Sequence, residues 1–349
     1  SLRQKEKELA QKEKKLKEHI KKNKESNNND TEKADKKSLA DINKQKKKIK
    51  RQISNLTIRM PIMRELEKGR TTNLFIKGNR EDLGVVVKPG VPAIMNNFPA
   101  DAPKNRLGLA QWITSVKNPL TPRVAVNRLW EQLFGYGIVK TLEDFGSQGE
   151  KPSHPQLLDY LAYNFMHTHN WSFKAMIREI MMSDTYRQSS IATAEKISQD
   201  PANKYLARFS RVRMSSEMLR DQALNASGLL SDKMFGPSVM PYQPEGVWSV
   251  VYSGANWKLS KGEDQYRRGL YTYWRRTSPY PAMETFDMPS REVCSTRRLR
   301  TNTPLQALVT LNDPAYIEMA NHLGQRMRTF KGDFNEKINH GFELLLVRQ

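Results

Sequence analysis

The side chains best suited to chemistry lie between residues 262 and 330, where the chain has ten arginines and no lysine. Aromatic residues from Tyr266 to Phe286 alternate with the arginines. A guanidinium group binds an oxyanion through two parallel hydrogen bonds and also stacks on rings, and lysine does neither as well. We therefore predict a surface for acidic glycans, sulfated or uronic, made of Arg267, Arg268, Tyr271, Trp274, Arg275, Arg276, Arg291, Arg297 and Arg298.

Two other interpretations of this stretch stay open. Arginine and aromatic residues also suit single-stranded nucleic acid, which we favour least. Alternatively, the arginines pair with nearby acids in a structural network, because a buried guanidinium needs a partner. The acids available for such pairs within the stretch are Glu263, Asp264, Glu284, Asp287 and Glu292.

Three carboxylates are candidates for catalysis, namely Glu245, Asp287 and Glu292, because each lies in a loop beside aromatic residues. Binding and catalytic residues concentrate in such loops. Two carboxylates at a suitable separation would permit glycoside hydrolysis, but a sequence does not supply that separation. His154 is a weaker candidate for a general base, since it lies at a predicted helix start, where Ser153 is expected to be the cap.

Histidine and cysteine give no pattern of a metal site. His167 and His169 are two residues apart, so they do not share one helical face. The chain has one cysteine, Cys294, which excludes an internal disulfide framework and a cysteine-based zinc or iron–sulfur site. We predict no metal ligands and interpret Cys294 as a buried thiol.

The positive charge is concentrated at the start of the chain. The net charge is +21, and residues 1–59 supply 17 lysines, 3 arginines and 9 acids, a net +11, without one aromatic residue. Leucine and isoleucine recur there at spacings of three, four and seven, the pattern of two helices that bury a narrow seam. A polar stretch at 24–31 separates them. We predict an antiparallel, coiled-coil-like helical hairpin with lysines on its solvated faces, rather than a nucleic-acid-binding arm.

The rest of the chain predicts a mainly α fold with minor β structure. We divide it into residues 60–104, short strands and loop that pack on the body, and residues 105–349, a multi-helix body. Helices are expected at 105–112, 122–134, from 153, at 172–182 and at 215–230, and Asn127 is expected to satisfy buried polar groups. No apolar run is long enough to span a membrane. The final helix, at 342–349, lacks a terminating residue, so we expect the body to be C-terminally incomplete.

Seven motifs, in order, carry a family resemblance. They are Asn118 to Trp130, Phe134-Gly135, Glu143 to Gly146, Pro152 to Pro155, Thr185 to Ser190, Pro241 to Gly246 and Thr301 to Leu308. In this order and spacing the chain resembles the domain of unknown function 1553 family over roughly residues 60–349.

The resemblance implies context rather than a reaction. Such domains follow a domain of unknown function 1549, and often a cytochrome c-like domain, in large exported proteins of planctomycetes and some Bacteroidetes. Their genes tend to lie among those for polysaccharide degradation. We therefore expect a periplasmic or cell-surface protein with these two domains as partners, in the same or a neighbouring chain. Any haem c would belong to a missing domain or a partner, since this chain lacks Cys-x-x-Cys-His.

Together these observations predict an accessory or binding domain in the use of acidic polysaccharide. One alternative is a structural or assembly module with no ligand of its own. The other is a glycoside-acting hydrolase that uses the loop carboxylates. Whether the chain is an enzyme stays undecided at this stage.

Overall fold

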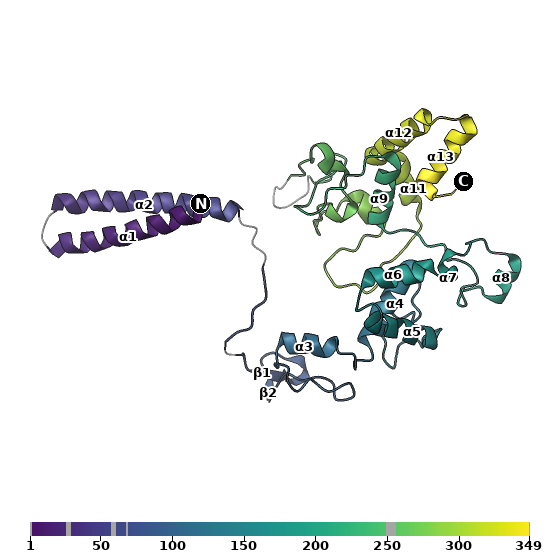
Figure 1. The fold of residues 1–349 in the computed structure, drawn as a ribbon, viewed down its shortest axis with the longest axis horizontal. Coiled ribbons are helices and arrows are strands. Elements are labelled where there is room, and N and C mark those ends of the chain that lie inside the picture. The colour runs from purple at the N-terminus through teal and green to yellow at the C-terminus, as the bar shows by residue number, and fades with distance from the viewer. Residues whose placement is uncertain (1, 26–28, 57–60, 68, 249–255, 349) are drawn as a thin grey trace. The chain divides into compact units, whose positions relative to one another are not determined.

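The structure, a computed structural model, describes residues 2–25, 29–56, 61–67, 69–248 and 256–348. Helices dominate the described residues, and a small two-stranded antiparallel sheet accompanies them. The predicted fold class, mainly α with minor β, is therefore confirmed. The chain divides into two compact units, Ser1–Pro89 and Gly90–Gln349, and Figure 1 shows their elements.

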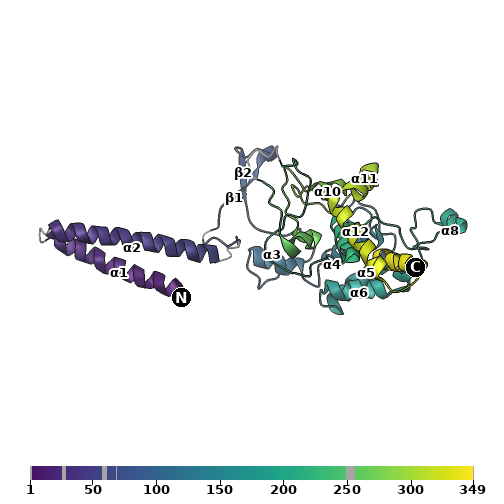
Figure 2. The same ribbon diagram turned by 90° about the horizontal axis from the view of Figure 1, so that it is seen from above.

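The first unit begins with the predicted helical hairpin. Helices α1 (Leu2–Glu25) and α2 (Asn29–Leu56) lie side by side in both views (Figures 1 and 2). Part of the predicted polar break, residues 26–28, lies outside the described residues. The partly buried positions step by three and four along each helix, as in a coiled-coil seam: 2, 6, 9, 13, 16 and 20 on α1, and 35, 39, 42, 46, 49 and 53 on α2.

A charged pair interrupts the apolar seam of this hairpin. The Glu13 carboxylate accepts hydrogen bonds from the Nζ atoms of Lys17, at 2.6 Å, and of Lys46 on the opposite helix, at 2.5 Å. These bonds lower the pKa of Glu13 to about 2. A polar contact at one seam position fixes the register of two helices that leucines alone would let slide.

A β-hairpin follows in the same unit. Strands β1 (Thr72–Phe75) and β2 (Leu83–Val87) pair antiparallel, with Thr72 opposite Val87 and an irregularity between Asn73 and Phe75. A short 3₁₀ turn, η1 (Ile76–Gly78), joins them. Most side chains of the two strands are exposed. That this region packs on the helical body stays a prediction.

The second unit contains one core around α4 (Thr121–Phe134), α5 (Pro155–His167) and α6 (Phe173–Met182), after the short α3 (Arg106–Ile113). The Asn105 side chain caps α3 and that of Ser172 caps α6. Helix α4 ends where Gly135 takes a left-handed φ of 87°. Ten buried residues form this core: Val126, Trp130, Phe134, Ile138, Val139, Leu158, Leu161, Phe165, Met176 and Ile180.

The expectation that Ser153 caps α5 is wrong. His154 occupies the N-cap position without a side-chain cap bond. The Ser153 hydroxyl instead donates to the Ile138 carbonyl oxygen at 3.2 Å. It therefore ties the helix start to the loop after α4.

The C-terminal half of this unit packs around α9 (Ser216–Ser227), whose cap is Ser215. Helix α12 (Pro314–Thr329) packs on α9, and Leu224, Ala315 and Met319 form a small core between them. Tyr280, Ala282, Met283 and Met288 form another. The other elements are α7 (Asp184–Arg187), α8 (Ala194–Gln199), η2 (Gly262–Tyr266), η3 (Gly269–Tyr271), α10 (Pro281–Thr285), α11 (Pro304–Asn312), α12 (Pro314–Thr329) and α13 (Phe334–Leu346).

The final helix ends earlier than expected. Helix α13 stops at Leu346, and Val347 takes a left-handed φ of 52° as the C-cap. The expectation of a helix that runs unterminated through 349 is therefore wrong. Within the described residues, no helix is both long and apolar enough to cross a membrane.

The Glu13 contact predicts an acid-sensitive hairpin. Its pKa in the hairpin lies below the ordinary value of 4.5, so protonation favours the unfolded chain and stability falls as the pH drops from 4.5 towards 2. Circular dichroism of a peptide of residues 1–59 should show a lower melting temperature over that range. Glu13→Gln should melt lower than wild type at pH 7 and lose much of this pH dependence. An identical pH profile in both peptides would contradict the assignment.

Candidate functional site

A closed loop presents the arginines of the predicted surface. Residues 288–300, which we call the arginine loop, contain no helix or strand. Asp287 closes the base of this loop, because its carboxylate accepts hydrogen bonds from the backbone N of Thr301 at 2.8 Å and from the Thr301 hydroxyl at 2.9 Å. The Arg213 guanidinium donates to the same carboxylate. The two ends of the loop are thus held together by one side chain.

The local backbone supports this closure. Asp287 has a φ of 60°, a left-handed conformation that aspartate tolerates better than most residues. At the same base of the loop, the Gln306 amide donates to the Thr285 carbonyl oxygen at 3.1 Å and to the Thr301 hydroxyl at 3.2 Å. Asp287 is therefore engaged on both oxygens as a structural anchor, which does not suit a free catalytic carboxylate.

The arginine loop forms one wall of a groove of about 830 Å3. This arginine groove brings together four predicted ligand residues, Arg268, Arg291, Arg297 and Arg298. Helix α9 forms the other wall with Glu217 and Asp221. The volume falls within the usual range of ligand-binding clefts, roughly 300–1,000 Å3.

Three of the four arginines pair with acids from other elements. Arg268 contacts Asp221 at 3.1 Å and Arg298 contacts Glu217 at 2.6 Å. Burial is the largest single influence on Glu217 and opposes its ionisation, but the Arg298 hydrogen bond and charge, with bonds from the backbone and Ser216, together lower the pKa of Glu217. Arg297 has a looser pair with Glu143 at 3.5 Å, and both side chains are about half exposed. Such exposed pairs contribute little to stability, about 0–1 kcal/mol each, and are open to competition from another anion.

Arg291 differs from these three arginines. In the part of the chain that the structure describes, it has no carboxylate partner. Its guanidinium carbon lies 5.5 Å from the centre of the Trp274 ring, and the Trp274 indole N–H donates to Ser290 at 3.1 Å. The ring therefore orients the guanidinium and leaves its donors available.

The other predicted ligand residues lie outside the groove. Arg267 is 1% exposed, stacks on Tyr271 at 3.7 Å and donates to the carbonyl oxygens of the 233–237 loop. Arg275 lies over Trp248 at 5.1 Å, and Arg276 is exposed. The aromatic residues of this stretch thus serve as platforms for its own arginines.

A second hollow, of about 650 Å3, adjoins the arginine groove and shares Arg297 and Arg298 with it. Its walls add Lys140, Arg211 and Arg300, and Arg300 faces Glu131 at 3.5 Å. Sequence reasoning missed Lys140, Glu143 and Arg211 because they lie more than about 70 residues before the arginine loop in the sequence. The Glu143 to Gly146 motif was the available signal, but a motif does not reveal its spatial partner.

The remaining catalytic candidates are spread over three places. Glu292 lines the arginine groove. Glu245 lines a separate hollow with Trp248 and Trp257. His154 lies in a third pocket, between α4 and the 202–210 loop. The structure thus does not gather Glu245, Asp287 and Glu292 around one shared cleft.

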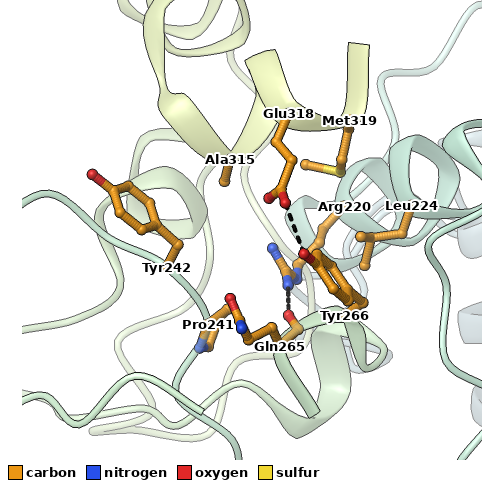
Figure 3. Close-up of a pocket in the computed structure, with 9 residues that line it drawn as sticks. All are labelled: Arg220, Leu224, Pro241, Tyr242, Gln265, Tyr266, Ala315, Glu318 and Met319. Atoms are coloured by element: carbon orange, nitrogen blue, oxygen red, sulfur yellow. Dashed lines mark hydrogen bonds between the residues drawn. The ribbon is translucent and has the colours of Figure 1, made fainter. Parts of the chain in front are cut away.

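A small polar cavity lies between α9 and α12 (Figure 3). The Arg220 guanidinium donates to the Gln265 carbonyl oxygen at 2.8 Å, and the Tyr266 hydroxyl donates to Glu318 at 2.7 Å. The latter bond raises the pKa of Tyr266. A volume of about 10 Å3 has room for roughly one water molecule. The hydrogen bonds around this cavity therefore link α9 and α12 to η2, and the cavity has no room for an organic ligand.

The contacts of the histidines outside these hollows indicate a structural role. His169 Nε2 contacts the Glu179 carboxylate at 2.5 Å, and His167 packs on the Tyr163 ring. Among the described residues, no three His, Cys, Asp or Glu side chains are grouped closely enough to hold a metal ion. A haem c needs two thioether-forming cysteines and the chain has one, so these residues do not fit that cofactor. The interpretation of Cys294 as a buried thiol is wrong, because the residue is exposed at the arginine groove.

The fold and the groove define a helical domain with a charged, arginine-lined surface, preceded by a separate helical hairpin. Residues 105–349 match the model of the family described as PSD1, protein of unknown function (DUF1553). The match covers most of the chain, and the chain belongs to this family. Comparison with curated proteins and with solved structures found no match.

The anchor formed by Asp287 leads to a prediction about stability. Asp287→Asn keeps a residue that tolerates left-handed φ but leaves Arg213, whose side chain is 12% exposed, without its charge partner. Loss of a largely buried ion-pair partner should lower the free energy of unfolding by about 2 kcal/mol after allowance for the partial exposure. Urea unfolding measures the change. Glu292→Gln is the matched control and should leave stability unaltered; equal stability of both variants and wild type would contradict the anchor.

Proposed function

We propose that this domain binds an acidic polysaccharide, sulfated or uronic, in the arginine groove. It acts as an accessory or binding domain of a larger, exported protein that is associated with a cytochrome c. The observation that carries the proposal is the convergence of Arg268, Arg291, Arg297 and Arg298 on one groove. Guanidinium groups are the side chains best matched to carboxylate and sulfate geometry.

The contacts of individual arginines in the groove support this proposal further. Arg291 lies over the Trp274 ring and, among the described residues, has no carboxylate partner, while Arg297 has a long, exposed contact with Glu143. A polymer anion therefore displaces a weak pair at Arg297 and meets no pair at Arg291. The adjoining hollow extends the cationic surface past Arg297 and Arg298, as a linear chain requires.

A structural or assembly module is the second candidate. The ion pairs Arg268–Asp221 and Arg298–Glu217 favour it, because they tie the groove walls together without any ligand. A hydrolase has less support, since Asp287 is engaged by Arg213 and Thr301 while Glu245 and Glu292 line different hollows. Binding measurements separate the first two candidates.

The wider context belongs to the same proposal. The family resemblance supports a periplasmic or cell-surface location, with a domain of unknown function 1549 and a cytochrome c-like domain as partners in the same or a neighbouring chain. Any haem c is carried there and not by these residues. Cell fractionation, together with a haem stain of the purified full-length protein, tests location and haem content independently of glycan binding.

Glycan binding tests the function directly. Isothermal titration of the protein with heparin and with polygalacturonate should show binding of at least one of them and none of dextran. Arg291→Lys keeps the charge but loses the planar fork, so the affinity should fall about tenfold, the lower end for an arginine–anion contact. Arg297→Lys should weaken binding to a smaller degree, because its own pair competes.

The matched control is Arg276→Lys, at an exposed arginine outside the groove. Its affinity should equal that of wild type. Absence of binding to both acidic polymers, or equal affinities for Arg291→Lys and Arg276→Lys, would contradict the proposal and support the structural module. Tighter binding of a single-stranded oligonucleotide than of either glycan would contradict it as well.

A further inference from the structure

The third pocket, beside His154, shares no residue with the arginine groove, although Tyr136, Gly137, Lys140 and Glu150 also line the second hollow. It has a volume of about 380 Å3, within the range of small-molecule sites. Buried core residues form its floor, among them Trp130, Phe134 and Ile138. Its rim carries Lys140, Lys151 and Lys204, which come from three separate segments.

The first wall of the pocket is the loop after α4, which is rigidly held. The buried Asn127 side chain accepts from the Val139 N–H at 2.8 Å and donates to the Val139 carbonyl oxygen at 2.9 Å. A Cβ atom at Gly137 would come within 2.4 Å of that same carbonyl oxygen. Glycine is therefore the residue that fits at position 137, and this wall is already formed before any ligand binds.

The second wall, residues 200–210, is held just as firmly. The buried Asp200 carboxylate accepts from the backbone N–H groups of Lys204 and Tyr205, at 2.7 Å each. Asn203 and Leu206 both take left-handed φ values, 50° and 55°. Non-glycine residues in this region cost free energy and persist where the surroundings enforce them, often at ligand sites. Both residues line the pocket.

The polar groups of the pocket can form further ion pairs and hydrogen bonds with a ligand. In the described chain, no carboxylate pairs with Lys140, Lys151 or Lys204, all of which are exposed. The Nδ1 atom of His154 lies 2.9 Å from the Ser153 hydroxyl oxygen, which leaves Nε2 for a ligand. Glu150 and Tyr136 complete the rim. Three ammonium groups attract one anionic group, while the single carboxylate suits the hydroxyl donors of the same ligand.

We propose that this pocket binds a hydroxylated organic anion of monosaccharide size, with one carboxylate or phosphate held by Lys140, Lys151 and Lys204 and its hydroxyl groups near Glu150 and His154. The pocket differs from the arginine groove in size and in the type of cation. Lysine acts as a mobile point charge, which suits a small anion that enters and leaves.

Calorimetry tests the pocket with three probes: glucuronate, glucose 6-phosphate and glucose. Binding of glucuronate or of glucose 6-phosphate, with none of glucose, is the expected result, and the stronger of the two identifies the anionic group. The double variant Lys151→Ala with Lys204→Ala should bind that anion at least about tenfold more weakly, because two charge contacts are lost. Both lysines are exposed, so the melting temperature should stay unaltered.

The matched control removes two exposed lysines elsewhere, Lys117→Ala with Lys174→Ala, and should bind as wild type does. Arg291→Lys should also bind these small anions normally, which separates the pocket from the groove. His154→Gln provides a second test and should weaken binding without loss of fold. Absence of binding to both anions by wild type, or equal affinity of the two double-lysine variants, would overturn the proposal.

Discussion

The candidate site depends on the carboxylate of Asp287. That single side chain binds Thr301 and Arg213, so it connects the end of α10, the start of α11 and the segment before α9. Residues 288–300 have no regular secondary structure of their own, and this closure joins their two ends. Folding the loop costs conformational entropy for each residue that it fixes. The hydrogen bonds between Asp287 and Thr301 at the two ends of the loop, with the partly buried ion pair to Arg213, offset part of that cost.

The arginines and the aromatic rings around them also stabilise one another within the chain. Sequence composition indicated guanidinium groups and rings that would face a ligand together, but the rings of Tyr271 and Trp248 lie against Arg267 and Arg275 of the same chain. An unpaired guanidinium in a partly buried place needs an acceptor or a π face. The protein provides that face from a residue nearby in space. On the arginine loop, Arg291 over the Trp274 ring and Arg297 with its long contact to Glu143 are the arginines most open to a ligand.

Local features of this chain could be predicted from sequence and long-range pairs could not. Heptad spacing, Gly135 after α4 and the serine before α9 each act within a turn or two, so the hairpin and the helices around α4 and α9 were predicted correctly. Helices α11 and α12 were not predicted. The arginine network was expected to use acids of its own stretch. Arg298 instead pairs with Glu217 and Arg297 with Glu143, because the fold brings α9 and the loop after α4 against the arginine loop. Ser153 is not the cap because the helix begins one residue later than expected, with His154 at the N-cap position.

The distribution of lysine and arginine follows from these different tasks. Lysine dominates the hairpin, where a strongly hydrated charge on a flexible stem keeps a narrow seam in solution. On the arginine loop, arginine provides the charges that are held against a carboxylate or a ring. Lysine returns at the rim of the His154 pocket, where no carboxylate of the described residues pairs with it. Ordering a long side chain costs conformational entropy unless a partner compensates for it. The arginines of the loop are therefore cations that the fold has already oriented, whereas the lysines at the pocket rim are cations that a ligand would have to order.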